Sequence, residues 1–94
     1  TKTIETRAEE ISTFLKAISN KNRLIILCAL CKGEKCVGEL ELVSDLSQSA
    51  LSQHLAKLRH EGLVETRREA QTIYYSTNHP AVKIFMKAMC DYYA

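Results

Sequence analysis

Cysteine supplies the most reactive side chains in this chain, because a thiolate can bind a soft metal or take part in redox chemistry. The four cysteines are Cys28, Cys31, Cys36 and Cys90. Catalytic dithiols place a C-x-x-C motif at an exposed helix N-terminus, whereas Cys28 and Cys31 lie inside an apolar run. The spacings also lack the paired C-x-x-C knuckles of structural zinc sites. With no hydrolase triad, glycine-rich phosphate loop or carboxylate pair in the sequence, we expect free thiols and no metal, cofactor or enzymatic activity.

Cys36 is a separate case because it stands where a helix N-cap is expected. In Cys36-Val37-Gly38-Glu39 the thiol replaces the serine or threonine of a capping box. A thiol at a helix N-terminus and beside Lys35 is placed to lose its proton and react. The alternative for every cysteine is inert packing as a small apolar side chain. We favour that alternative for Cys31 and Cys36, and both interpretations stay open for Cys28 and Cys90.

A second group of residues offers hydrogen-bonding chemistry rather than reactivity. The segment that follows Leu46 is rich in serine and glutamine, and its polar side chains lie around a leucine stripe at helical spacing. Glutamine can bind adenine through two hydrogen bonds, and serine is short enough to reach a base or a phosphate. The candidate DNA contacts in this segment are Ser47, Gln48, Ser49, Ser52, Gln53, His54 and Lys57.

A basic ribbon follows, in which Arg67 and Arg68 lie beside an expected hairpin tip at Glu69-Ala70. A ribbon with paired arginines can lie along the DNA backbone or enter the minor groove. Gln71 and Thr72, on the opposite strand, complete this second group of candidate DNA contacts. The alternative is a polar helix face and hairpin that only meet solvent, and nearby glutamates weigh against a strongly basic surface.

The elements that must position these groups can be recognised from periodicity and from capping residues. Helices are predicted over 4–18, 21–31, 37–43, 48–60 and from Pro80 onward, with strands over 63–68 and 71–76. Asn20 and Ser47 stand at N-cap positions, and Pro80 suits a first helical turn. We therefore predict a mainly α fold with a β-hairpin, namely a winged helix-turn-helix domain over 1–94. Its helix-turn-helix is 37–60 and its wing is 63–77.

The same patterns predict which side chains enter the core. Leu51, Leu55 and Leu58 should form the inward stripe of helix 48–60. In helix 37–43 the expected buried residues are Val37, Leu40 and Val43. The apolar residues of 4–18 and of the last helix lie on one side, which makes these helices candidates for pairing with a second copy.

Composition is compatible with a nucleic-acid partner but does not establish one. The 94 residues carry a net charge of +2, and 46% of them are hydrophobic. Residues 1–46 are balanced, so the basic excess lies in the second half. The longest apolar run has eight residues, far from the roughly 18 that a membrane helix needs. We expect a cytoplasmic protein with no membrane partner.

At these segments the chain resembles the ArsR/SmtB family of bacterial winged-helix repressors. The matching segments are 15–19, 22–24, 37–40, 46–55, 58–64 and 66–75. The resemblance implies a homodimer that is joined through helices 4–18 and 79–93 and represses transcription from palindromic operator DNA. It also implies an inducer that shifts the dimer to a state of lower DNA affinity.

Within the family, the chain is most similar to a subgroup without metal sites, some of whose members sense persulfides or oxidants through two cysteines. Cys28 falls where those members carry the thiol of their second helix. Their other thiol aligns with Ala94, and Cys90 lies one helical turn earlier on the same face. Our hypothesis is that a reactive sulfur species or an oxidant modifies Cys28 and Cys90 and thereby releases DNA.

The metal-sensing patterns of the family look incomplete here. The arsenic-sensing Cys-Val-Cys is reduced to Cys36-Val37-Gly38, and the zinc-sensing positions of the last helix are His79, Ala81 and Tyr92. We expect His79 to cap the last helix. Three alternatives stay open: a regulator without a thiol switch, a metal- or metalloid-responsive one with unusual cysteine ligands, and a winged-helix module that binds only proteins.

Overall fold

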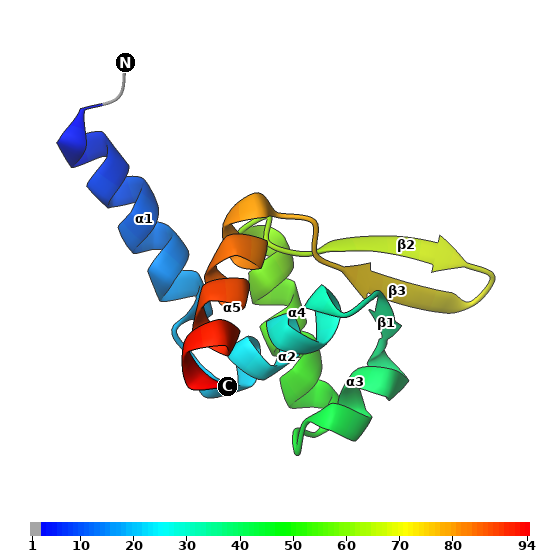
Figure 1. Cartoon of the computed structure of the whole chain (residues 1–94). Coiled ribbons are helices and arrows are strands. Elements are labelled where there is room, and N and C mark those ends of the chain that lie inside the picture. The colour runs from blue at the N-terminus through cyan, green and yellow to red at the C-terminus, as the bar shows by residue number, and fades with distance from the viewer. Residues whose placement is uncertain (1–2) are drawn as a thin grey trace.

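The computed structural model describes residues 3–94, and its fold is a winged helix-turn-helix (Figure 1). This confirms the predicted class and order of helices. In chain order the elements are α1 (Ile4–Ile18), α2 (Lys21–Cys31), β1 (Lys35–Cys36), α3 (Val37–Val43), α4 (Gln48–His60), β2 (Glu65–Glu69), β3 (Thr72–Ser76) and α5 (Pro80–Tyr93).

Side-chain caps fix where the helices begin. The Asn20 carboxamide oxygen accepts hydrogen bonds from the backbone N–H groups of Asn22 and Arg23, at 2.9 and 3.1 Å. At the start of α4 the Ser47 hydroxyl accepts from the N–H of Ala50 at 3.2 Å. The capping roles predicted for Asn20 and Ser47 are therefore confirmed, and α2 and α4 begin at the expected residues.

The sheet differs from the prediction in two respects. It has three antiparallel strands in the order β1-β3-β2, and β1 was not foreseen. A strand of two residues has no periodicity of its own, and it exists here because Lys35 and Cys36 pair with β3. The turn lies at Ala70-Gln71 rather than at Glu69-Ala70, and Ala70 adopts a φ of 56°. Without glycine or asparagine at the tip, the sequence carried no signal for this left-handed residue.

The core lies where α4 packs against α2 and α3. Leu51, Leu55 and Leu58 of α4 are fully buried, as predicted. They join Ile26 and Leu27 of α2 in one cluster. Leu63 and Val64, predicted to begin the first strand, are instead buried in the segment that precedes β2. Hydrophobic side chains of α4 therefore face inward along its whole length, and its polar residues face outward.

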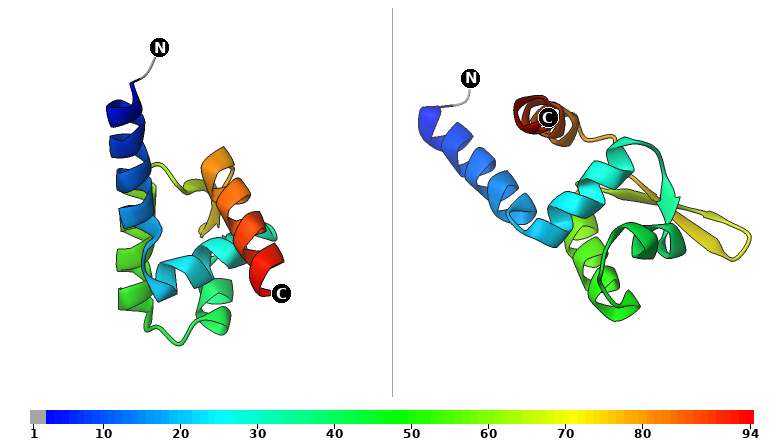
Figure 2. Two further views of the ribbon diagram at one scale, coloured as in Figure 1. Left: turned by 60° about the vertical axis from the view of Figure 1, so that its left-hand side comes forward. Right: turned by 60° about the horizontal axis from the view of Figure 1, so that its bottom comes forward.

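One expectation about burial was wrong: Val43, in the last turn of the short helix α3, is 48% exposed. Most of the apolar side of α1, the candidate surface for pairing with a second copy, is uncovered: Ile4 is 85% exposed and Ile11 is 57% exposed. Figures 1 and 2 show the first half of α1 extending away from the rest of the chain. None of the helices within residues 3–94 is long and apolar enough to cross a bilayer.

Candidate nucleic-acid interface

The exposed side of α4 carries the polar side chains predicted to read DNA. Ser47, Gln48 and Ser49 are exposed at its N-terminal end, and Ser52, Gln53 and Lys57 are exposed further along. His54 is only half exposed. Because the leucines on the other side are fully buried, the helix cannot rotate without opening the core. The arrangement can therefore present hydrogen-bonding groups to a partner in a fixed orientation.

A buried serine holds the turn between α3 and α4. The Ser44 hydroxyl donates a hydrogen bond to the Leu40 carbonyl at 3.1 Å, and both residues are buried. Ser47, three residues later, uses its hydroxyl oxygen as the N-cap of α4. Ser47 thus has a structural role in addition to its predicted contact with DNA, which limits how far its side chain can move.

The two wing arginines differ in their surroundings, which the sequence did not reveal. Arg67 Nε lies 3.1 and 2.9 Å from the two carboxylate oxygens of Glu34, and its Nη2 also contacts Glu34. Its Nη1 pairs with Glu69 at 3.0 Å. The guanidinium also lies over the Tyr74 ring, 4.6 Å from its centroid. Hydrogen bonds from Arg67 hold the pKa of Glu34 below its usual value, and those to Glu34 and Glu69 raise the pKa of Arg67. Arg67 therefore fastens the wing to the loop before β1.

Arg68 lies on the opposite face of the hairpin. It pairs across the strands with Ile73, and it shares that face with Thr66 and Tyr75. The Tyr75 ring lines a hollow together with residues of α4, among them Arg59. Arg68 thus extends from the face of the wing that is turned toward α4, and its side chain is exposed.

The sequence prediction omitted two basic residues on the same side. Arg59 and His60 are exposed at the end of α4 and line the hollow with Tyr75. Their position on the polar side of an amphipathic helix, near its end, could have indicated them as candidate DNA contacts. Of the two remaining wing candidates, Gln71 is exposed in the turn, whereas Thr72 is half-buried.

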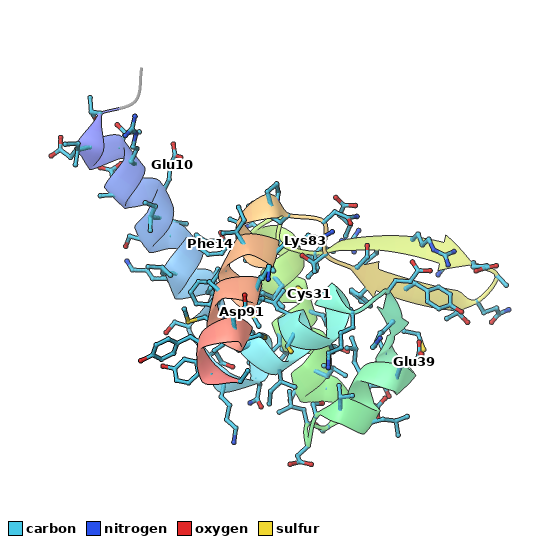
Figure 3. The ribbon with its side chains drawn as sticks, in the orientation of Figure 1. Glu10, Phe14, Cys31, Glu39, Lys83 and Asp91 are labelled. Atoms are coloured by element: carbon cyan, nitrogen blue, oxygen red, sulfur yellow. The ribbon has the colours of Figure 1, made fainter. Side chains whose placement is uncertain are left out.

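Three of the four thiols meet in one hollow between the end of α2 and α5. Cys28 and Cys90, predicted to act together, both line this space of about 330 Å³. Cys31 lines it too and is exposed, so the apolar packing expected for Cys31 is not found. Cys31 is the last residue of α2, where the helix leaves the core. Partial burial and the neighbouring thiols raise the pKa of Cys31, while Lys83 acts in the opposite sense (Figure 3).

Cys36 is apart from this group and has the capping position predicted for it. Its backbone N–H donates to a carboxylate oxygen of Glu39 at 3.0 Å. This bond and a second one with the Cys36 thiol lower the pKa of Glu39. The cysteine is half-buried and pairs with Tyr74 of β3 in the sheet.

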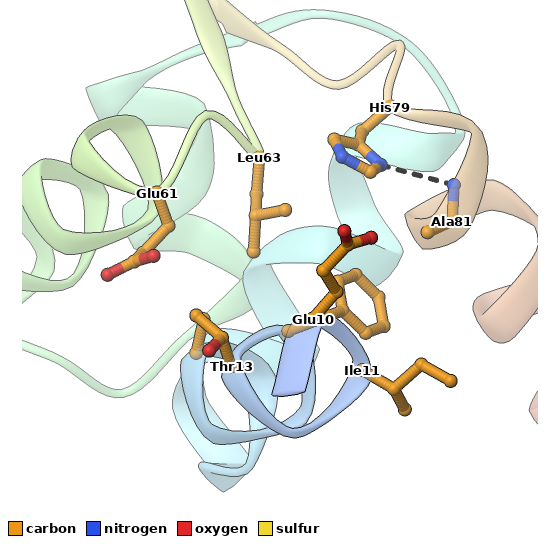
Figure 4. A pocket seen from close by; sticks show the side chains of 9 residues that line it. Glu10, Ile11, Thr13, Glu61, Leu63, His79 and Ala81 are labelled. Atoms are coloured by element: carbon orange, nitrogen blue, oxygen red, sulfur yellow. Dashed lines mark hydrogen bonds between the residues drawn. The ribbon is translucent and has the colours of Figure 1, made fainter. Parts of the chain in front are cut away.

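A further hollow, of about 360 Å³, separates α1 from the first turn of α5 (Figure 4). The His79 Nδ1 accepts a hydrogen bond from the Ala81 N–H at 3.1 Å, so His79 caps α5 as predicted. Its ring stacks on Phe14, with 6.1 Å between centroids. In the part of the chain that the structure describes, no group of three histidine, cysteine or acidic side chains could hold a metal ion.

Comparisons with known proteins agree with this geometry. The model of the family described as "Bacterial regulatory protein, arsR family" matches residues 20–66. The nodulation protein NolR of Rhizobium meliloti is 54% identical over 86 residues, which cover 92% of this chain and 70% of NolR. The structure of reduced HlyU from Vibrio cholerae is similar with a TM-score of 0.92 and 46% identity, covering 97% of this chain and 96% of that chain. The transcriptional repressor BigR from Xylella fastidiosa has a TM-score of 0.90 and 37% identity, covering 97% and 93%.

Proposed function

This chain belongs to the arsR family of bacterial regulatory proteins, and we propose that it is a homodimeric repressor that places α4 in the major groove of operator DNA. Its similarity to the transcriptional repressor BigR and to the transcriptional activator HlyU supports a role in transcription regulation. The observation that carries the proposal is the two-sided character of α4. Three leucines of one side are fully buried, and the opposite side carries exposed serine, glutamine and lysine.

The proposed contacts follow from the chemistry of each side chain. Gln48, Gln53 and the serines of α4 are suited to base edges and nearby phosphates, and Lys57 is suited to phosphate. In the wing, Arg68 is the proposed phosphate contact, and Gln71 in the turn is a second proposed contact. Arg67 can reach DNA only by exchanging its contacts with Glu34 for phosphate, so we assign it mainly to holding the wing.

The proposed dimer is supported by apolar side chains that nothing covers in one copy. Ile11 of α1 is 57% exposed, and Ile84 and Tyr92 of α5 are 71% and 77% exposed. Burying such residues against a second copy removes apolar area from water, the main driving force for association. A two-fold dimer then places its two α4 helices about 34 Å apart, one turn of DNA, and matches a palindromic operator.

The test uses DNA from upstream of the gene for this protein and a scrambled duplex of equal length. Fluorescence anisotropy should give a tighter Kd for the upstream duplex. Gln48→Ala and Gln53→Ala should remove most of this preference, whereas Asn78→Ala, an exposed amide outside α4 and the strands, should leave it unchanged. Equal affinity of the unsubstituted protein for both duplexes, at several salt concentrations, would contradict sequence-specific binding to this region.

We also propose that modification of thiols by persulfides or oxidants lowers the DNA affinity. The support is that Cys28 and Cys90 line the same hollow between α2 and α5. A coupling of about 1–3 kcal/mol is typical of such regulation. Operator affinity is measured before and after polysulfide or peroxide treatment, in the unsubstituted protein and in Cys28→Ser. Equal affinity in all four conditions would favour a regulator without this switch.

A further inference from the structure

The hollow between the end of α2 and α5, here called the thiol hollow, combines an apolar floor with a basic rim. Met86 of α5, which is 8% exposed, and the half-buried Cys28 of α2 line the floor and belong to the hydrophobic core. A protonated thiol behaves as a small apolar group, so the cysteines add to this apolar lining. The rim carries three exposed lysines, Lys32, Lys83 and Lys87. Among residues 3–94, no carboxylate lines the thiol hollow.

The chain itself does not neutralise the charge of this rim. Within the described range 3–94, neither Lys32 nor Lys83 forms an ion pair. Lys87 pairs with Asp91 at 2.9 Å, in a contact exposed to solvent and therefore weak. The carbonyl end of α2 adds a partial negative charge of about half a unit, which the two unpaired ammonium groups outweigh. The thiol hollow therefore favours an anion.

The thiol hollow remains open in the proposed dimer. Successive residues of a helix are about 100° apart, so Lys83, Lys87 and Cys90 project from one side of α5. Ile84 and Tyr92, the exposed apolar residues that we assign to the dimer, lie on a different side. A second copy that covers Ile84 and Tyr92 therefore leaves the entrance free for a small molecule.

An anion that fits this lining must also have an apolar part. Inorganic phosphate would leave the apolar floor in contact with water, and a nucleic-acid strand would contact only the rim. An organic acid with an alkyl chain meets both requirements, because the chain covers Cys28 and Met86 while the carboxylate meets ammonium groups. The volume of about 330 Å³ holds about ten groups the size of a water molecule, at roughly 30 Å³ each. Octanoate, with ten non-hydrogen atoms, matches this size.

We propose that the thiol hollow is a binding site for an amphipathic carboxylate, with its alkyl chain on Met86 and Cys28 and its charged end beside Lys32 and Lys83. The ligand binds without covalent chemistry, so the proposal goes beyond DNA binding and the thiol switch and depends on neither. Because the ligand contacts both α2 and α5, its binding stabilises the contact between the core and the helix assigned to the dimer.

The first test titrates the reduced, ¹⁵N-labelled protein with octanoate below the concentration at which micelles form. Amide shifts should saturate in residues 28–32 and 83–90, with a Kd on the order of 1 mM, as expected for a small ligand in an open hollow. Octanoate should bind about fourfold more tightly than hexanoate, because two more methylenes are partly buried. Acetate should cause no saturable shift. Equal affinity for octanoate and hexanoate, or no saturation in these residues, would overturn the proposal.

The second test concerns charge. Lys32→Gln with Lys83→Gln should weaken octanoate binding about tenfold, because two ion pairs are lost, and should leave binding of the uncharged octan-1-ol unchanged. The matched control is Lys16→Gln with Lys21→Gln, which removes the same charge from exposed positions elsewhere and should affect neither ligand. Equal weakening for both ligands, or none for octanoate, would contradict a site selective for carboxylates.

The third test separates a free ligand from the anionic surface of a bilayer. Because the thiol hollow is concave and small, the protein should stay in solution when vesicles of phosphatidylglycerol are sedimented. Binding to the vesicles without a saturable octanoate shift would assign the lysines to a membrane surface and overturn the site for a free carboxylate. All three tests are made without DNA, so their failure would leave the proposed regulator intact.

Discussion

Arg67 and Arg68 are neighbours in the chain, yet the pleat of the hairpin sends their side chains to opposite faces. Arg67 has all its nitrogens directed to Glu34 and Glu69 and its flat side to Tyr74. Arg68 faces the side of the wing where Tyr75 approaches α4. The two arginines carry the same charge but have different partners: Arg67 pairs with carboxylates of the chain itself, whereas Arg68 remains available to an anion from outside.

Salt dependence separates the two arginines. Arg68→Ala should weaken DNA binding and reduce the slope of log K against log salt by about 1, as expected for one lost phosphate contact. Arg67→Ala should weaken binding through a looser wing, with the slope nearly unchanged. Anisotropy titrations from low to high salt measure both slopes. If Arg67→Ala reduced the slope as much as Arg68→Ala, Arg67 would be a phosphate contact instead.

The Glu34 carboxylate makes the attachment of the wing sensitive to acid. Since its pKa is lowered in the folded chain, its contribution is fully present above the ordinary value of 4.5 and is lost as the pH falls through the folded pKa. Amide exchange in β2, followed by NMR as the pH is lowered, should show loss of protection below that value. Glu34→Gln should abolish this pH dependence. A transition of the same size in Glu34→Gln would assign it to another group.

At the scale of elements, one set of α4 residues holds the helix in the fold and a different set faces outward. Ser47 caps its N-terminus and three buried leucines hold it on the core, while Ser52, Gln53 and Lys57 remain exposed. Stability and the proposed DNA recognition are therefore assigned to separate faces of one helix. Substitutions on the two faces should have separable effects.

Leu55→Ala should lower the free energy of unfolding by about 2–5 kcal/mol, because it leaves a cavity in the core. Gln53→Ala should change that free energy by less than about 0.5 kcal/mol but weaken operator binding by about 1–3 kcal/mol. Urea denaturation and anisotropy measure the two quantities. A Gln53→Ala protein as unstable as Leu55→Ala would show that the two faces are not independent.

Most of this element pattern could be predicted from the sequence, because its signals are local. Asn20, Ser47 and Pro80 mark helix starts, and the leucines of α4 repeat at helical spacing. The contact between Arg67 and Glu34 joins residues 33 positions apart and has no local signal. The exposure of Cys31 was missed for a related reason, since periodicity cannot tell the buried middle of a helix from an end that leaves the core. Strand β1 forms only because it pairs with β3, so no local pattern predicts it.

At the scale of the whole molecule, the fold leaves apolar surface on α1 and α5 that one copy cannot bury. The first half of α1 extends from the body (Figures 1 and 2). The C-terminal turn of α5 carries two exposed tyrosines, Tyr92 and Tyr93. A domain with one reading helix binds DNA more tightly, and recognises a palindromic site, when two copies pair. In the proposed dimer, both properties depend on the exposed apolar surface of α1 and α5.

Ile11→Glu should therefore convert a dimer into a monomer, because a buried unpaired carboxylate opposes association. Light scattering after size-exclusion chromatography measures the mass, and operator affinity should fall in parallel. Leu42→Glu is the matched control, since Leu42 is 87% exposed on α3, outside the proposed interface. A dimer that persists in Ile11→Glu would place the interface elsewhere.

The placement of α4 in a DNA groove is tested most directly by titrating the ¹⁵N-labelled protein with its upstream duplex and following amide shifts by NMR. The largest shifts are expected in the first half of α4 and in the turn between β2 and β3. Small shifts are expected in the thiol hollow. Unchanged α4 amides at saturating DNA, with the largest shifts on another surface, would contradict the placement of α4 in the groove.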